Sequence, residues 1–191
     1  QGAAADSGAL DQVLVERAVQ RLKGRFDSTY GGFGGAPKFP PDMDLELLMA
    51  EYGHRKDPAL LRMVTHTLEQ MARGGIHDHL GGGFHRYATD DHWGVPHFEK
   101  MLYNQAPLAK VYLQAYQLTG QEEFRQTAED IFAFVSQVMK APEEGFCSAL
   151  DSETDGVEGE YYLWTEAQIR QVLGAQAELF LKVYALEPMP E

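Results

Sequence analysis

The sequence predicts an almost all-helical fold built from repeated helical hairpins, and three observations predict it. Apolar residues recur at helical spacing in several windows, capping and stop signals bound these windows, and the connections between them alternate between long and short. Antiparallel helices joined in this way bring all the long connections to one face and all the short ones to the opposite face. We therefore expect the function to reside in the long loops.

Apolar periodicity predicts five helices before residue 140. Their apolar positions are Leu14, Ala18 and Leu22; Leu45, Leu48, Met49 and Tyr52; Leu61, Val64, Leu68 and Met71; Phe98, Met101, Leu102, Ala109, Tyr112 and Tyr116; and Phe124, Ala128, Ile131, Val135 and Val138. Asp57 before Pro58 predicts the N-cap and first turn of the third helix. Pro107 removes a backbone donor inside the fourth helix, so we expect a kink or break near Gln105. Gly120 predicts the end of that helix.

Two further helices are expected toward the end of the sequence. Thr165 and Gln168 have the spacing of a capping box at the start of the sixth helix, Gly174 predicts its end, and the seventh is expected to begin near Gln176. The long connections are residues 24–41, 74–96 and 141–164, whereas the others are short turns.

Each long connection carries a glycine followed by a phenylalanine, at Gly32-Phe33, Gly83-Phe84 and Gly145-Phe146. Glycine permits a positive φ, and we expect each ring to pack into the helical layer. The last two loops are also predicted to form β-hairpins. The expected pairs are residues 84–87 with 92–95, and residues 146–150 with 160–164.

Composition and charge exclude several classes of function. The formal net charge of −13 repels phosphate backbones and acidic membranes, so we expect neither nucleic acid nor membrane as a partner. The single cysteine, Cys147, excludes an internal disulfide and a Cys-x-x-Cys redox pair. No apolar run is long enough to span a bilayer, and the first residues do not resemble a signal peptide. A cytoplasmic location is therefore expected.

The second long loop is dense in groups that transfer protons. Together with the start of the helix that follows it, this loop carries five of the seven histidines, interspersed with carboxylates. Histidine titrates near neutral pH, and a neighbouring carboxylate changes its pKa. The candidate catalytic residues are His77, Asp78, His79, Asp90, His97 and Glu99. The alternative interpretation is that single histidines cap turns and bind loop backbone.

Aromatic and charged residues in or beside the long loops are candidates for contacts with a sugar, since rings stack on its apolar faces and charged groups bind its hydroxyls. The candidates are Lys38, Phe39, Arg86, Tyr87, Trp93, Lys100, Tyr103, Asp151 and Glu158. We expect no metal and no cofactor. His77-x-His79 lacks a third zinc ligand at a recognisable spacing. The acidic turn at residues 151–158 resembles the start of a calcium loop, but Tyr162 stands where the bidentate glutamate belongs, which leaves calcium binding open.

Several segments together resemble the YyaL and spermatogenesis-associated protein family. They are Gly31-Gly-Phe-Gly-Gly-Ala-Pro-Lys-Phe-Pro40, Gly81-Gly-Gly-Phe-His-Arg-Tyr87, Val95-Pro-His-Phe-Glu-Lys-Met-Leu-Tyr103, Gly145-Phe-Cys-Ser-Ala149 and Glu158-Gly-Glu-Tyr-Tyr-Leu-Trp164. The resemblance implies a thioredoxin-like domain upstream of a six-hairpin (α/α) toroid, similar to those of sugar 2-epimerases and six-hairpin glycosidases. Residues 1–191 would then form about three hairpins, the N-terminal part of the toroid. The family pattern has acidic residues where this chain has Asn104 and Leu150.

Two classes of function follow from the loops and the resemblance. The first is a carbohydrate-active enzyme that binds a sugar or sugar derivative. In an epimerase-like version, histidines among His77, His79 and His97 act as base and acid, and in a hydrolase-like version two carboxylates among Asp78, Asp90, Glu99 and Asp151 flank the bond. The second class is a non-catalytic binding or scaffold domain.

Placement in the chain also predicts where the site lies and what else the chain contacts. His97 and Glu99 are expected in the first turn of the fourth helix, with Arg86 reaching the same helix end, where the helix dipole would favour a carboxylated or phosphorylated sugar. We further expect exposed apolar helix faces, covered by the remaining half of the toroid or by a self-association partner.

Overall fold

The computed structural model describes residues 12–184 and residue 186, which fall into two units, Gln1–Ser152 and Glu153–Glu191. Each unit is described by itself. The first unit contains five helices: α1 (Gln12–Arg25), α2 (Asp42–Arg55), α3 (Pro58–Arg73), α4 (Leu102–Thr119) and α5 (Glu122–Gln137). It also contains four short strands: β1 (Tyr87–Ala88), β2 (Pro96–His97), β3 (Lys100–Met101) and β4 (Ala149–Leu150). The predicted mostly helical fold with small β-hairpins is therefore confirmed.

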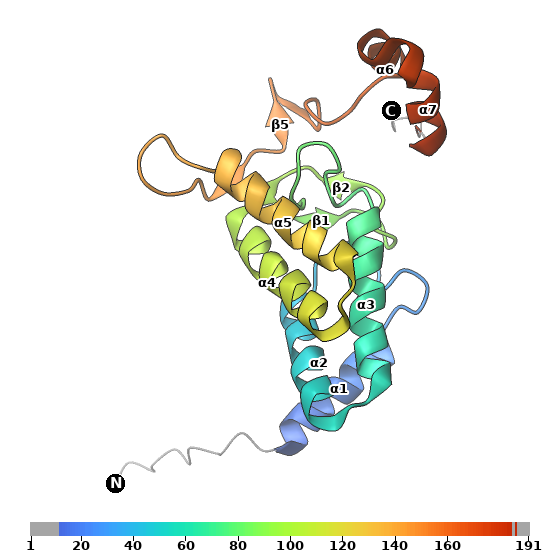
Figure 1. Ribbon diagram of the computed structural model, residues 1–191, viewed down its shortest axis with the longest axis vertical. Helices are drawn as coiled ribbons and strands as arrows, with labels where there is room; N and C mark the ends of the chain where they lie inside the picture. The colour runs from blue at the N-terminus through green and yellow to red at the C-terminus, as the bar shows by residue number, and fades with distance from the viewer. Residues whose placement is uncertain (1–11, 185, 187–191) are drawn as a thin grey trace. The chain divides into compact units, whose positions relative to one another are not determined.

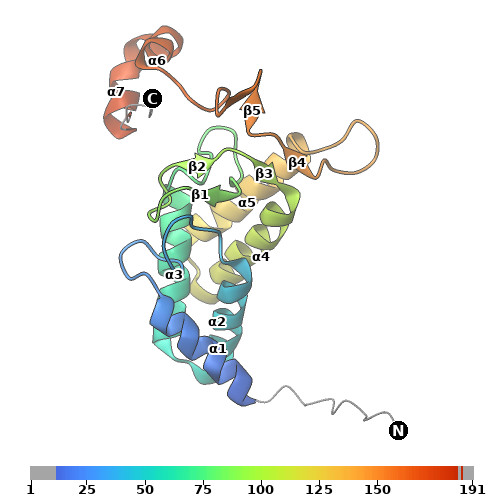
Figure 2. The ribbon, with the colours of Figure 1, turned by 180° about the vertical axis from the view of Figure 1, so that it is seen from behind.

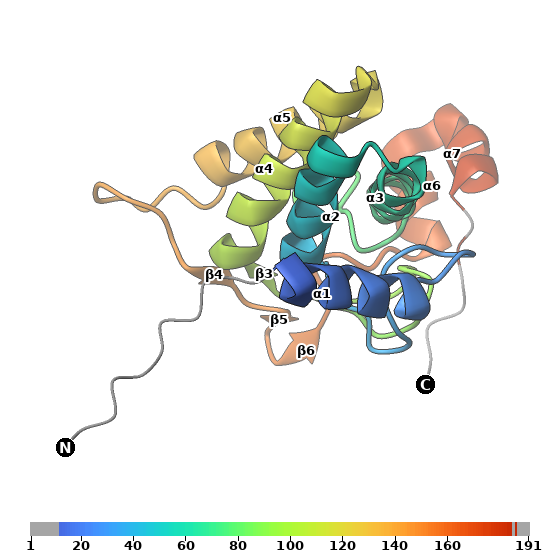
Figure 3. The same cartoon turned by 90° about the horizontal axis from the view of Figure 1, so that it is seen from below.

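The helices of the first unit pack as two hairpins with α1 alongside. Helices α2 and α3 are joined by a short turn, as are α4 and α5, and each pair packs together (Figure 1). Helix α2 lies between α3 and α4, as Figure 3 shows. Asp57 accepts a hydrogen bond from the Ala59 N–H with Pro58 in the first turn, and Gly120 ends α4 with a φ of 70°, so both end signals are confirmed.

The core lies between the four helices of the hairpins and extends to α1 and the second long loop. Its fully buried members include Leu48, Leu68, Tyr112 and Phe124. The Tyr112 hydroxyl donates to the Leu68 carbonyl oxygen at 2.9 Å, so the ring is buried without loss of its hydrogen bond. Burial of these side chains supplies the main stabilising contribution, about 1.5–3 kcal/mol for each large apolar residue.

The first two long loops and the part of the third loop up to Leu150 meet at one end of the helices, as predicted. The Lys38 N–H donates to the Ala88 carbonyl and the Ala88 N–H donates to the Lys38 carbonyl, at 2.8 and 2.9 Å, which joins the first two loops. Strand β4, from the third loop, pairs antiparallel with β3, with Lys100 opposite Leu150. The rear view shows the first two loops gathered around β1 and β2 (Figure 2).

The first predicted β-hairpin exists, but its pairing is different. Strands β1 and β2 place Tyr87 opposite His97, whereas residues 84–87 were expected to pair with 92–95. Two contacts explain the shift. Phe84 is fully buried, with its N–H and carbonyl bound by the Gln105 side chain, and Asp90 accepts hydrogen bonds from three N–H groups of the turn. Residues 84 and 92–95 are therefore not available for the strands.

The prediction for the second hairpin is wrong. Residues 146–150 do not pair with 160–164, since β4 pairs with β3 and a separate hairpin joins β5 (Glu153–Thr154) to β6 (Val157–Glu158). The physical reason is the Asp155-Gly156 turn, where both residues have positive φ, at 53° and 82°. This pair suits a two-residue hairpin turn, which closes the strands locally.

The expected start of the fourth helix is also wrong. Residues 96–101 are extended because β2 and β3 each pair with another strand, so α4 begins at Leu102. The Leu102 N–H donates to the Ser148 carbonyl at 2.9 Å. The predicted break near Gln105 does not occur, because α4 continues through Pro107 to Thr119.

The second unit contains the β5–β6 hairpin, then α6 (Glu166–Leu173), a 3₁₀ turn (Gly174–Gln176) and α7 (Ala177–Val183). The capping box of Thr165 and Gln168 and the end of α6 at Gly174 are confirmed. None of the helices within the described part of the chain is both long and apolar enough to cross a membrane.

Candidate functional site

Three of the predicted sugar-contacting and catalytic residues form a column of rings on the long-loop face. The Phe39 and Tyr87 ring centroids lie 4.8 Å apart, and those of Tyr87 and His97 lie 5.1 Å apart at an interplanar angle of 20°. The pairing of β1 with β2 sets Tyr87 opposite His97, and the Lys38–Ala88 bridge brings Phe39 beside them. We call Phe39, Tyr87 and His97 the ring column. Phe39 is 51% exposed, so the column borders solvent.

A charged network continues from the ring column. Glu99 Oε2 lies 3.7 Å from His97 Nε2 and accepts a hydrogen bond from Arg86 Nη1 at 2.9 Å. The Arg86 Nε donates to the Tyr103 hydroxyl oxygen at 3.1 Å. Hydrogen bonds to Glu99 and Tyr103 raise the pKa of Arg86, so its guanidinium stays charged. Arg86, Glu99 and His97 are only partly covered, and they face the same region of surface.

The position of this network changes the expectation about ligand charge. His97 and Glu99 lie in and just after β2 and not in the first turn of α4, so the dipole of α4 does not act on them as predicted. Arg86 is neutralised by Glu99 at 2.9 Å. The arrangement therefore gives no support to the expected preference for a carboxylated or phosphorylated sugar.

Lys38 and Trp93, two other predicted sugar contacts, are buried and stabilise the loops through hydrogen bonds. The Lys38 Nζ donates to Asp27 Oδ2 at 2.7 Å and to the Gly31 and Asp91 carbonyl oxygens at 2.8 and 2.6 Å. It also lies 5.3 Å from the centre of the fully buried Trp93 ring. Burial alone would raise the pKa of Asp27, but hydrogen bonds from Lys38 and from backbone N–H groups hold it below its usual value.

Lys100 braces the second loop in a similar way. Its Nζ donates to Asp78 Oδ2 and to the Gly82 carbonyl, both at 2.7 Å, and lies 4.5 Å from the centre of the Phe134 ring. Asp78 also accepts hydrogen bonds from the Leu80 and Gly81 N–H groups. Burial would raise the Asp78 pKa, but these bonds hold it below its usual value.

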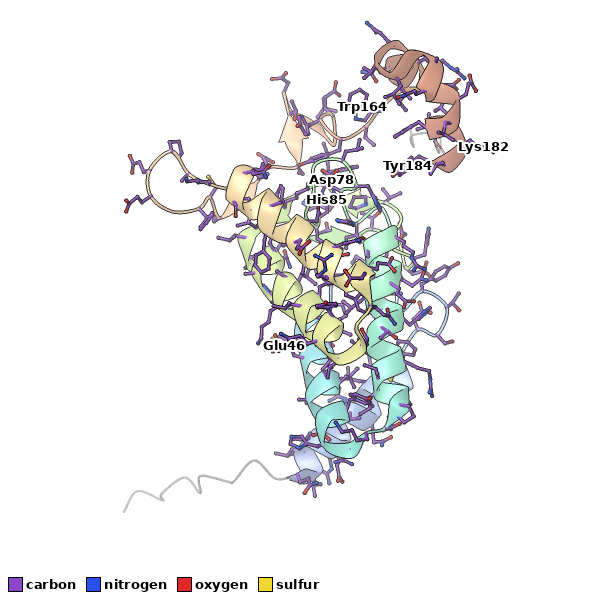
Figure 4. The ribbon with its side chains drawn as sticks, in the orientation of Figure 1. Glu46, Asp78, His85, Trp164, Lys182 and Tyr184 are labelled. Atoms are coloured by element: carbon purple, nitrogen blue, oxygen red, sulfur yellow. The ribbon has the colours of Figure 1, made fainter. Side chains whose placement is uncertain are left out.

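Buried His85 lies near the Lys100–Asp78 ion pair. Figure 4 shows Asp78 and His85 at the loop end of the helices. Burial, and then the positive charge of Lys100, lower its pKa to about 4, so it is neutral at pH 7. Its Nδ1 lies 3.0 Å from the Phe98 carbonyl oxygen.

The other candidate catalytic residues bind backbone groups of the second loop or of the end of α3 that precedes it. His77 Nδ1 lies 3.0 Å from the Ala72 carbonyl, and its Nε2 lies 2.9 Å from Asp130 Oδ2. Asp130, which the sequence did not single out, also accepts from the Gly83 N–H, and the contact with His77 is the main cause that lowers its pKa. His79 Nε2 lies 3.0 Å from the Gly74 carbonyl, and Asp90 binds the turn described above.

Asp151 and Glu158 are both exposed and do not belong to the same unit. Asp151 follows β4 in the first unit, whereas Glu158 lies in β6 of the second. Among the described residues, no group of three or more histidine, cysteine, aspartate or glutamate side chains is arranged to hold a metal ion. The structure thus brings together Phe39, Arg86, Tyr87, His97, Glu99 and Tyr103. The buried candidates Lys38, Trp93 and Lys100 instead stabilise the loops.

Comparisons with solved structures identify the fold. The chain is similar to a cellobiose 2-epimerase from Bacillus thermoamylovorans B4167, with a TM-score of 0.60 at 19% identity, over 93% of this chain and 52% of that one. A sugar epimerase from a ruminal bacterium gives a TM-score of 0.60 at 20% identity, over 87% of this chain and 49% of that one. The fold is therefore that of a partial epimerase-like helical toroid.

Comparisons of sequence identify the relatives. No protein-family model matches the chain. It is 42% identical to human spermatogenesis-associated protein 20 over 190 residues, which is 89% of this chain and 24% of that protein. The mouse protein of the same name is 43% identical over 84% of this chain and 22% of its own length. The chain thus spans about a quarter of the length of these relatives, and it belongs to the family of spermatogenesis-associated protein 20.

Proposed function

We propose that the first unit forms part of a carbohydrate-active site that binds a sugar or sugar derivative on the long-loop face. The observation that carries the proposal is the junction of the ring column with the network of Arg86, Glu99 and Tyr103 on that face. Ligand sites typically combine aromatic walls with a few fixed polar groups. Here the rings would contact the apolar face of the sugar. Arg86 donates hydrogen bonds to hydroxyl groups, and Glu99 accepts them.

For the reaction, we favour an epimerase-like step in which His97 transfers the proton. His97 as base removes the proton from C2 of the opened aldose, and the electron pair moves onto the C1 carbonyl oxygen to give an enediolate. A water molecule on the opposite face then returns a proton to C2, and the proton held by His97 passes to solvent. Glu99, at 3.7 Å, would stabilise the imidazolium that forms. Of the three histidines, we favour His97 because it stacks on Tyr87 in the ring column and lies beside Glu99.

A hydrolase-like step has less support. It needs two carboxyl groups on either side of the glycosidic bond. Asp78 and Asp90 are engaged by backbone N–H groups, and Asp78 is also paired with Lys100. Both have their pKa held below the usual value despite burial, whereas a general acid needs a raised pKa.

The alternative is a non-catalytic binding domain, and one observation favours it. Three of the six candidate catalytic residues, Asp78, His79 and Asp90, bind loop backbone. His77 binds the Ala72 carbonyl at the end of α3. A domain that presents the ring column without chemistry would use the loops in the same way. Such a domain would bind sugar without turning it over.

The test follows deuterium incorporation at C2 of a panel of reducing sugars in D₂O by NMR, with the full-length protein. We compare the wild type with His97→Ala and with the control His54→Ala, an exposed histidine in the last turn of α2. The epimerase proposal expects exchange in the wild type and the control but not in His97→Ala. Binding without exchange in the wild type would favour the binding domain, and no binding of any sugar would refute the proposed function.

A further inference from the structure

An open pocket of about 460 Å³ adjoins the ring column at one end. It lies between the end of α1, the glycine- and proline-rich segment at residues 33–41, and the start of α2. Phe33 and Phe39 line it from the segment, Arg25 from α1, and Met43 and Asp44 from α2. A volume of this size lies within the range of roughly 300–1,000 Å³ that is typical of small-molecule sites.

The walls of the pocket combine apolar and hydrogen-bonding groups. Phe39 and Met43 expose 51% and 80% of their surface. Burial is the main cause that raises the pKa of Asp44, while the Arg25 charge nearby opposes the rise. A partly desolvated carboxylate gains from hydrogen bonds to donors. Hydroxyl groups of a neutral ligand can supply these donors without bringing a further charge into the pocket.

The pocket and the His97 network are parts of one continuous surface. Phe39 lines the pocket and contacts Tyr87 in the ring column, and Tyr87 contacts His97. A ligand with one ring at His97 and a second ring in the pocket would contact the column along its length. One sugar ring cannot fill a pocket of this volume and reach His97 across two ring contacts at the same time.

We infer that the ligand is a neutral oligosaccharide, with one sugar unit at His97 and at least one further unit in the pocket between residues 33–41 and the start of α2. This inference rests on the proposed function and defines its substrate class. Sequence analysis did not single out Arg25 or Asp44, because neither residue stands in a motif that the loops repeat.

The test measures how affinity depends on the number of sugar units. Calorimetry on the full-length protein uses neutral gluco-, manno-, galacto- and N-acetylglucosamine series of one to four units. In the wild type, the best series is expected to bind about tenfold more tightly as an oligomer than as a monomer. Asp44→Asn and Met43→Ala are expected to lose that gain while they keep monomer binding. The matched control is Glu46→Gln, which changes a carboxylate on the same helix that pairs with Lys110 outside the pocket.

Each other outcome overturns a defined part of the reasoning. If both pocket variants keep the gain, the further units bind elsewhere and the inference is wrong. If monomers and oligomers bind the wild type equally, and Tyr87→Ala abolishes both, the inference is wrong while the proposed function stands. If no series binds, both are wrong.

Discussion

Replacing Lys100 with methionine removes the cation that ties the second long loop together. The Lys100 side chain is 1% exposed, and its Nζ lies 2.7 Å from Asp78 Oδ2. Methionine fills a similar volume but leaves the Asp78 carboxylate, 13% exposed, and the Gly82 carbonyl without this donor. The substitution therefore removes one contact and also leaves the buried negative charge of Asp78 without its counter-ion.

The expected magnitude follows from that burial. Removing one partner of a buried ion pair costs about 3–5 kcal/mol, because the remaining charge is not compensated. Asp78 keeps its hydrogen bonds from Leu80 and Gly81, so we expect the lower end, about 3 kcal/mol. For a protein of this size, this cost lowers the Tm by roughly 6–12 °C.

The assay is urea and thermal unfolding followed by circular dichroism. Lys110→Met is the matched control, because Lys110 also pairs with a carboxylate, Glu46, at 2.8 Å, but its side chain is 56% exposed. An exposed pair contributes about 1 kcal/mol or less. In addition, Asp78→Asn with Lys100→Met should cost less than the two single changes added together. A loss in Lys100→Met no larger than in Lys110→Met would refute the reasoning.

Three further predictions concern stability. The pKa of His85 falls from 6.5 to about 4 on burial, so between these pH values the unfolded chain binds a proton that the folded chain does not. Stability should therefore fall by up to about 3 kcal/mol as pH drops through that window, and urea unfolding of His85→Gln should lack this loss. Gly83→Ala, at a φ of +74°, would place a Cβ 2.5 Å from Phe134 and should cost about 2 kcal/mol or more in thermal unfolding, whereas Gly120→Ala, at +70° with open space, should cost less. Asp57→Ala should lower the midpoint of urea unfolding, because it removes both the α3 cap and the ion pair with Lys23, and an unchanged midpoint would contradict this.

The helices could be predicted from the sequence because their signals are local. Apolar spacing, the Asp57 cap and the Gly120 stop each depend on residues within a few positions of one another. The strand partners could not be predicted in this way. Strand β4 pairs with β3, and the two are about 50 residues apart in the chain, so no local pattern distinguishes this partner from residues 160–164.

The glycine–phenylalanine repeat also shows that a local sequence pattern does not predict the surroundings of a single residue. Phe84 is fully buried and Phe33 packs against the core, as expected, but Phe146 is 53% exposed. Identical dipeptides thus have different surroundings, because burial depends on which helix covers the loop. In the second loop that helix is α5, whose Phe134 contacts Gly83 closely enough to exclude any side chain there.

The candidate site could be predicted only in part, because the same residue types serve catalysis and loop structure. A long loop carries many backbone polar groups that need partners when they are buried. Asp78, Asp90 and His77 satisfy such groups, and Lys38 and Lys100 do so from buried positions that are rare for lysine. Many of the reactive side chains in this loop therefore hold its backbone in place.

That rigidity bears directly on the proposed chemistry. Proton transfer and sugar binding both need groups held within a fraction of an ångström of their working positions. Lys38 joins the first loop to the carbonyl of Asp91 in the second loop, and β1–β2 pairing fixes Tyr87 opposite His97. Phe39 follows Lys38 directly in the chain, so the buried ion pair with Asp27 also fixes the end of the ring column that borders the pocket. Residues that take no part in the proposed chemistry thus set the distance between the pocket and His97, and with it the length of oligosaccharide that the proposed site could hold.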